Sequence, residues 1–377
     1  MKFSEIPGHE TIKERMRQMK LQGRIPHALL LEGPAGIGKL SLARAFAQYI
    51  HCTNPTADGD SCGECKSCRL HQAMTHLDLY YVFPVVKADG AQSAPISDDY
   101  RDAWIEFLEG RLFMDFNGWA STFTKKNANP IIYVTESSAL IRSLSLTSHI
   151  SKEKIVIFYL PEKLNAEAAN KILKLIEEPY ENTYFIMVSD NPAAILPTIY
   201  SRVQRIKVSR MPDDTVAAYL SQQHGISYTD ALAVAHNAEG IMTKAFDLLQ
   251  QPKDAAVNFE LFVSLMRLAY QRNVKELKAW SEKITELGRE KEAKFYDNCI
   301  RLMRENFIYK LGEPQLNYMN SEENTFSSRF SRFITEKNVE KLIATFEKAK
   351  SDIMANANGK IVNFDTAIKV IILLVPR

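Results

Sequence analysis

Residues 27–39 read HALLLEGPAGIGK, an apolar run that leads into a glycine-rich turn. The apolar part predicts a short buried strand, and the spacing of residues 39–51, KLSLARAFAQYIH, predicts a helix directly after the turn. Between them, GPAGIGK matches the G-x-x-x-x-G-K phosphate loop in the strand–turn–helix setting that this motif requires. Its backbone N–H groups and the helix N-terminus favour bound phosphate. The candidate nucleotide-binding residues in this loop are Gly33, Gly36, Gly38 and Lys39.

Strand and helix signals alternate further along the chain. Strands are predicted from residue 154 (KIVIFYL), at 183–189 (TYFIMVS) and at 204–209 (QRIKVS), with a helix at about 165–177. Such alternation is typical of a parallel sheet covered by helices on both faces. We therefore expect the phosphate loop to lie in an α/β domain.

After about residue 212 the spacing is helical throughout. We expect an α/β nucleotide-binding-type domain over residues 1–209, short helices over 210–250 and longer helices over 251–377. The stretch at about 80–130, here called the insertion, lies within the first domain. The length of 377 residues is typical of two or three domains, the first of which carries the nucleotide site.

The insertion itself is predicted to contain a surface loop at 84–99, a helix at 100–115 and a polar loop at 117–130. One side of the predicted helix carries four large apolar residues: Tyr100, Trp104, Phe107 and Leu108. We interpret this face as ordinary packing. A surface that contacts DNA or a neighbouring protein is the alternative.

The phosphate loop lacks the partners that ATP hydrolysis requires. The residue after Lys39 should be Ser or Thr to hold magnesium, but it is Leu40. The buried strand at 154–160 should end in acids, but it ends in Tyr159 and Leu160, with Glu162 beyond the expected pair. We therefore predict little or no intrinsic hydrolysis. Binding of ATP or ADP stays open, and a glycine-rich turn without any ligand is the alternative.

Four of the five cysteines lie close together in the sequence, as Cys52, Cys62, Cys65 and Cys68. Short Cys-x2-Cys turns present thiolates well to zinc, and four sulfur ligands leave no open position for catalysis. The spacing predicts a structural zinc knuckle over residues 52–68. Free reduced cysteines are the alternative.

The composition describes an ordinary globular chain of 377 residues, with 46% hydrophobic residues, 24% charged residues and a net charge of +2. This charge gives no overall positive field for nucleic acid, so DNA contacts would have to be local or shared with partners. No apolar run reaches the roughly 18–20 residues of a membrane span. The N-terminus MKFSEIPGHE lacks the order of a secretory signal, so we expect a cytoplasmic protein.

Several further segments carry a family resemblance. Phe3, Ile6 and Gly8 open the chain, and RIPHA at 24–28 precedes the phosphate loop. Longer matches are NAEAANKILKLIEEP at 165–179 and LPTIYSRVQ at 196–204, where Val203 takes the place of the usual cysteine. Together with the four-cysteine knuckle, these segments resemble bacterial clamp-loader subunits of the gamma and delta-prime type, which are AAA+ proteins. The resemblance is strong over 1–78 and 150–245.

The resemblance implies an AAA+ sheet domain, a helical lid and a helical collar through which subunits assemble. It also implies gamma/tau and delta subunits as partners, and a ring that loads a sliding clamp onto primer-template DNA. Arg202 would act as a trans arginine finger toward the γ-phosphate in the next subunit; a surface or ion-paired arginine is the alternative. Ser189 would correspond to the sensor-1 residue and Lys244 to the sensor-2 residue. A strand-end serine and a solvated helix lysine are the alternatives for these two.

Leu40 and the missing acids favour the member that does not hydrolyse ATP, the delta-prime-like subunit, within a DNA polymerase holoenzyme. Two alternatives remain within nucleotide chemistry: an active gamma/tau-type ATPase, and a P-loop nucleotide kinase with a zinc-held lid. A third is an AAA+ scaffold outside replication. The Ser201-Arg202 and Glu177-Glu178-Pro179 segments argue against the kinase.

Overall fold

Five parallel strands form one sheet in the described part of the chain, in the order β2-β3-β4-β1-β5. The strands are β1 Ala28–Glu32, β2 Leu79–Val82, β3 Lys154–Tyr159, β4 Thr183–Ser189 and β5 Gln204–Lys207. The predicted parallel α/β fold is therefore confirmed. The sequence predicts no strand at 79–82, where the structure has the edge strand β2.

The computed structural model describes residues 1–88, 90–123, 129–250, 252–313 and 316–374. The chain divides into two units. Unit 1 comprises Met1–Tyr219 and Ala238–Ala245, whereas unit 2 comprises Leu220–Asn237 and the residues from Phe246 onward. The helices that follow the sheet contribute to both units: α9 Asp213–His224, α10 Tyr228–Asn237 and α11 Met242–Gln250.

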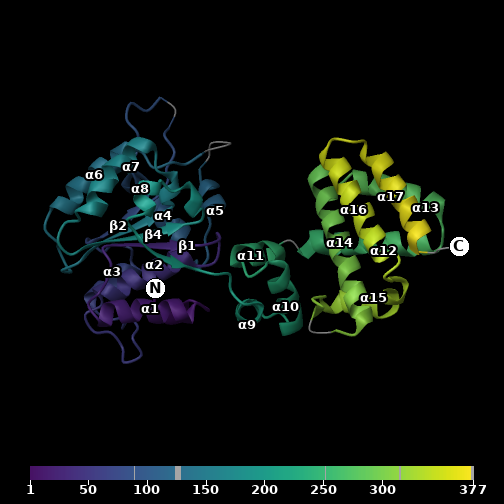
Figure 1. Ribbon diagram of the computed structural model, residues 1–377, viewed down its shortest axis with the longest axis horizontal. Helices are drawn as coiled ribbons and strands as arrows, with labels where there is room; N and C mark the ends of the chain where they lie inside the picture. Colours follow the sequence, from purple (N-terminus) through teal and green to yellow (C-terminus); the bar gives the residue numbers. More distant parts are fainter. Residues whose placement is uncertain (89, 124–128, 251, 314–315, 375–377) are drawn as a thin grey trace. The chain divides into compact units, whose positions relative to one another are not determined.

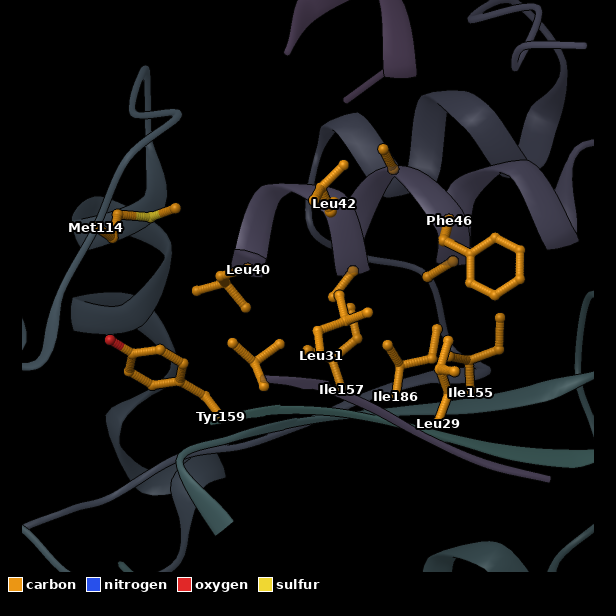
Figure 2. Close-up of a cluster of buried hydrophobic side chains, with 14 of the residues drawn as sticks. Leu29, Leu31, Leu40, Leu42, Phe46, Met114, Ile155, Ile157, Tyr159 and Ile186 are labelled. Atoms are coloured by element: carbon orange, nitrogen blue, oxygen red, sulfur yellow. The ribbon is translucent and has the colours of Figure 1, made fainter. Parts of the chain in front are cut away.

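Side chains of the central strands alternate between two apolar cores, as parallel strands buried on both faces require. Leu29 and Leu31 of β1 face the core beside α2, whereas Ala28 and Leu30 face the core on the other side. Figure 1 shows α2 and α3 on one side of the sheet and α6 and α7 on the other. Figure 2 shows the first of these cores, where apolar residues of α2 meet those of β1 and β3.

Unit 1 contains the predicted helix after the phosphate loop and several helices that the sequence analysis does not predict. Its helices are α1 Glu10–Leu21, α2 Lys39–His51, α3 Lys66–Gln72, α4 Arg101–Leu108, α5 Phe116–Ala120, α6 Val134–Ser145, α7 Ala166–Glu177 and α8 Pro197–Tyr200. Helix α7 illustrates the local logic. The Asn165 side chain accepts a hydrogen bond from the Ala168 N–H at the helix start, and the helix ends before Pro179. The helix predicted at 165–177 is confirmed.

The insertion differs from its prediction in two places. The helix predicted at 100–115 ends at Leu108. The polar loop predicted at 117–130 is wrong at its start, because α5 forms there; residues 124–128 lie outside the described residues. Asp115 caps α5 by accepting the Gly118 N–H, and Trp119 is fully buried with its Nε1 donating to the Pro84 carbonyl. A buried tryptophan thus fixes a helix where polar neighbours predict none.

The aromatic side of the insertion is packed against the sheet. Trp104 is 1% exposed, and its ring stacks on Phe83 with centroids 4.1 Å apart. It also contacts Trp119 and Tyr159, with centroids 5.0 and 5.5 Å away. These contacts support the packing interpretation of this face and bring the insertion to the carboxyl end of β3.

Beyond residue 251, the described chain is helical, as the sequence predicts. The helices are α12 Pro252–Tyr270, α13 Val274–Thr285, α14 Arg289–Leu311, α15 Ser321–Phe330, α16 Val339–Met354 and α17 Gly359–Leu374. Helix α14 packs along α16, and α13 packs along α17, around a core that includes Phe262, Trp280 and Phe295. Among the described residues, no helix combines the length and apolar character needed to cross a membrane.

Candidate functional site

The phosphate loop joins β1 to α2 in unit 1, as predicted. Gly36 and Gly38 have φ angles of 72° and 93°, which side chains disfavour, so glycine is needed at both turns. Gly38 is the N-cap residue of α2, and Lys39 is the first residue of that helix. The loop therefore has the backbone conformation of a phosphate-binding loop. Whether phosphate can bind depends on the side chains that surround it.

Lys39 is engaged by the protein's own groups. Its Nζ donates to the carbonyls of Gly33, at 2.9 Å, and of Pro34, and forms an ion pair with Asp190 Oδ1 at 2.7 Å. The side chain is almost completely buried. Burial lowers the pKa of Lys39, and the neighbouring Asp190 carboxylate opposes that shift. Asp190 thus supplies the negative charge that a phosphate would otherwise bring.

A segment of the insertion, Leu112–Met114, covers the start of α2. The Ser41 hydroxyl donates to the Leu112 carbonyl at 2.5 Å. A Cβ added to Gly38 would lie 3.1 Å from the Phe113 ring. Figure 2 shows Leu40 facing Met114 and Tyr159 within the apolar core. The residue that should hold magnesium is thus part of a hydrophobic contact.

The helical segment after the sheet approaches the same loop. Thr243, in the first turn of α11, donates its N–H to the Gly36 carbonyl at 3.4 Å, and a Cβ added to Gly36 would lie 2.0 Å from the Thr243 hydroxyl. Lys244 is directed elsewhere: its Nζ pairs with Glu239 at 3.0 Å, and its side chain is 43% exposed. The predicted sensor-2 residue thus directly follows Thr243, which contacts the loop, but its amine is held by Glu239.

The end of β3 offers no acid to a bound metal. Tyr159 is buried, and burial raises the pKa of its hydroxyl. Glu162 uses Oε1 to accept the N–H groups of Asp190 and Asn191, at 2.9 and 3.0 Å, so it braces the turn after β4. Ser189, the predicted sensor-1 residue, ends β4. Within the described chain, the buried hydroxyls of Ser189 and Tyr159 make no hydrogen bond.

Arg202 lies apart from this group. It follows α8, whose Ile199 packs in the core on the face of the sheet opposite α2. The side chain is 41% exposed; its Nε pairs with Glu177 Oε1 at 2.6 Å, and its Nη1 donates to the Thr198 carbonyl at 2.9 Å. The structure therefore presents a cation at the surface, held by its neighbours.

The four knuckle cysteines come together after α2. Their sulfur atoms all lie within 4.8 Å of one another, with Cys52–Cys62 and Cys62–Cys68 separations of 3.6 and 3.8 Å. Tetrahedral bonds of about 2.3 Å to a central metal would place sulfur atoms about 3.8 Å apart. The cluster therefore has the donor set and the spacing to hold a metal ion.

Backbone N–H groups already favour thiolates in this knuckle. Cys65 is the N-cap residue of α3 and accepts the Cys68 N–H at 3.4 Å, and Cys62 accepts the Cys65 N–H at 3.3 Å. Burial alone would raise the pKa of Cys65, but N–H donors outweigh it and lower the pKa to about 6. Burial raises the pKa of Cys68. A bound cation would remove that penalty.

Three buried histidines lie behind the knuckle, an arrangement that the sequence analysis does not predict. His51 Nδ1 and His71 Nε2 are 2.9 Å apart, and burial lowers the pKa of His51 to about 3 and of His71 to about 2. The His51 and His76 rings stack with centroids 4.3 Å apart and planes 18° apart. The ring nitrogens of His51, His71 and His76 lie within 4.8 Å of one another, close enough to share a metal ion. Burial favours the neutral rings that metal binding requires.

Sequence reasoning did not predict three partners of the candidate residues: Asp190 for Lys39, Leu112–Met114 for the loop and Glu177 for Arg202. Asp190 directly follows the predicted sensor residue, so its position was the available signal. The contact made by Leu112–Met114 joins segments about 70 residues apart and has no counterpart in local spacing.

Comparisons with known proteins agree with the resemblance. The family described as DNA polymerase III, delta subunit, matches residues 8–212, more than half of the 377 residues. DNA polymerase III subunit delta' of Haemophilus influenzae is 28% identical over 226 residues, covering 60% of this chain and 55% of the relative. Subunit tau of Bacillus subtilis is 24% identical over 329 residues, covering 82% and 50%.

The chain thus spans about half the length of the curated relatives it matches. Among solved structures, a DNA polymerase III gamma subunit-related protein from Thermotoga maritima is similar, with 14% identity, a TM-score of 0.38 and coverage of 96% of this chain and 99% of that one. The family match, over more than half of its length, decides the assignment: the chain belongs to the DNA polymerase III delta subunit family.

Proposed function

We propose that this chain is a non-hydrolysing, delta-prime-like subunit of a bacterial clamp loader. It helps to place a sliding clamp on primed DNA and offers Arg202 to the ATP bound by a neighbouring subunit. The family membership and the relatives named delta' and tau support this assignment. The observation that carries it is the ion pair that closes Lys39 against Asp190.

Phosphoryl transfer depends on magnesium, a positioned water and cations around the transferred phosphoryl group. Leu40 offers no oxygen to magnesium, and Tyr159 and Leu160 offer no carboxylate. Arg202, in contrast, keeps an exposed guanidinium, and a trans arginine is worth roughly 10³–10⁵ in rate. The proposed role is therefore assembly and stimulation of a neighbour.

The active gamma/tau-type ATPase differs from this proposal in one measurable property. We expect the purified chain with ATP and magnesium to show no turnover, and weak or absent ATP binding by calorimetry. Clear magnesium-dependent turnover would replace the proposal with a motor subunit. Transfer of phosphate to nucleoside monophosphates would instead favour the nucleotide kinase.

For the remaining parts we propose roles that follow from the same assignment. Zinc is the proposed metal of Cys52, Cys62, Cys65 and Cys68, with a structural role. Residues 210–250 are the proposed lid and 251–377 the proposed collar, through which the chain joins gamma/tau and delta subunits. The sliding clamp and primer-template DNA are partners of the assembled loader. Replication places this work in the cytoplasm.

A further inference from the structure

The guanidinium of Arg202 is held at one end only. An arginine has five N–H donors on a rigid plane. The Nε donor pairs with Glu177 at 2.6 Å, and Nη1 bonds to the Thr198 carbonyl at 2.9 Å and to the Ser201 hydroxyl at 3.4 Å. Nη2 has no hydrogen-bond or ion-pair partner among the residues that the structure describes. The contacts therefore fix the plane and leave its outer nitrogen available.

Both holding groups belong to firmly packed helices. Glu177 is the last residue of α7, and the preceding Ile176 is fully buried. Thr198 lies in α8, next to Ile199, which is 1% exposed. Ile176 and Ile199 belong to the same apolar core. The carboxylate and the carbonyl that hold Arg202 are thus mounted on one rigid surface.

The ion pair is too exposed to serve stability. The side chains of Arg202 and Glu177 are 41% and 44% exposed, and pairs of this kind contribute little to folding. Orientation is different, because a flexible arginine must be aligned before its planar fork can meet phosphate oxygens. Because Glu177 already holds Nε, the guanidinium loses less orientational freedom when it meets a phosphate.

We infer that Glu177 is a positioning residue for Arg202: its carboxylate fixes the guanidinium plane so that Nη2 faces the neighbour's γ-phosphate. This inference rests on the proposed function. Glu177 touches no substrate, so it acts only through Arg202. The resemblance assigns a role to Arg202, whereas the role of Glu177 comes from the contact itself.

The test uses the reconstituted clamp loader with clamp and primed DNA. Glu177→Ala is expected to lower kcat for DNA-stimulated ATP hydrolysis roughly tenfold, a smaller loss than that of Arg202→Ala. The KM for ATP should stay unchanged, since the nucleotide binds in the neighbour. Glu177→Gln keeps the acceptor oxygen and should retain part of the rate.

Glu178→Ala is the matched control. Glu178 is the adjacent exposed glutamate and has no ion pair within the described chain, so its removal changes the same surface charge without releasing Arg202. We expect wild-type kcat for this variant. The double variant Glu177→Ala/Arg202→Ala should be no slower than Arg202→Ala, because one residue acts through the other. Gel filtration checks that each loader assembles.

Each outcome has a separate meaning. Unchanged or increased kcat for Glu177→Ala, with a loss for Arg202→Ala, would overturn the positioning inference and leave the proposed function standing. Equal losses for Glu177→Ala and Glu178→Ala would also overturn it, in favour of a general charge effect. Unchanged kcat for Arg202→Ala would overturn the proposed function itself.

Discussion

The phosphate loop and the Arg202 surface are two parts of one domain that treat their cations in opposite ways. Lys39 is buried, bonded to two loop carbonyls and paired with Asp190. Arg202 is exposed, with a planar group that is aligned but not enclosed. The first cation is neutralised inside the chain, whereas the second stays available to another molecule.

This difference shows that the fold around a phosphate loop does not depend on every residue that phosphate chemistry uses. Strands β1 and β3, Ile37 of the loop and α2 all contribute to the core on the α2 face. The changed residues have become packing: Leu40 meets Met114 and Tyr159. The buried hydroxyls of Tyr159 and Ser189, without partners in the described chain, are the remaining cost, typically about 1–3 kcal/mol each.

The largest expected effect concerns the knuckle, which continues directly from the end of α2. Cys62→Ser, or treatment with a chelator, should remove the proposed zinc and unfold the knuckle locally. Structural zinc contributes apparent folding energy on the order of 10 kcal/mol. Mass spectrometry would report the metal, and hydrogen exchange would report the unfolding. We expect faster exchange over 52–76 and unchanged exchange around Arg202.

Cys299→Ala is the control for this experiment. Cys299 is a buried cysteine of unit 2, outside the knuckle, so its removal should leave the metal content unchanged. Full metal retention by Cys62→Ser would show that the four-thiol site is not what holds the ion. Faster exchange around Arg202 would show that the two regions are coupled.

A smaller effect concerns Glu136, which holds the insertion by accepting the Ser97 N–H. Burial raises the pKa of Glu136 from its usual 4.5 to about 7. The neutral carboxyl thus favours the folded state: its stabilisation is complete below about pH 4.5 and is lost as the pH rises through 7. That contribution is on the order of 3 kcal/mol.

Glu136→Gln should remove this dependence. The Tm of the variant minus the Tm of the wild type should be more positive at pH 8 than at pH 5. Equal differences at both pH values would mean that Glu136 does not titrate in this range. A rise in pH should also separate the two regions, because loosening the insertion should expose Leu112–Met114 and leave Arg202 unaffected.

The smallest expected effect concerns the Lys39–Asp190 ion pair, which distinguishes the phosphate loop from the Arg202 surface. Asp190→Asn removes the internal counter-ion of Lys39 and should raise affinity for inorganic phosphate by about tenfold, the scale of one charge-assisted hydrogen bond. Calorimetric titration would measure it, with Asp102→Asn on the exposed face of α4 as control. No gain would mean that the cover formed by Leu112–Met114 excludes anions without help from Asp190.

Strong local signals made much of the fold predictable. The phosphate loop between an apolar strand and a helix, the α7 helix and the knuckle spacing each carry their own chemistry over a short stretch. Helix α5 was missed because polar neighbours hide the buried Trp119. Strand β2 has only four residues, at the sheet edge, beside a segment interpreted as an insertion.

The candidate residues were predictable, but their state was not. Lys39 and Arg202 are both found by motif, and a motif does not tell a buried cation from an exposed one. That distinction depends on Asp190 and Glu177. Each lies 25 or more positions in the sequence from the cation that it pairs with. Such pairings follow from the packing of β4 and α7, which only the assembled sheet defines.

The central claim is that this chain works through Arg202 and not through its own phosphate loop. The most direct test is the rate of DNA-stimulated ATP hydrolysis by the reconstituted loader with wild type, Arg202→Ala and, as a control, Arg205→Ala, whose exposed guanidinium contacts Tyr200. We expect Arg202→Ala to assemble but to lower the rate by at least about tenfold, and Arg205→Ala to match the wild type. An assembled Arg202→Ala loader with the wild-type rate would contradict the account.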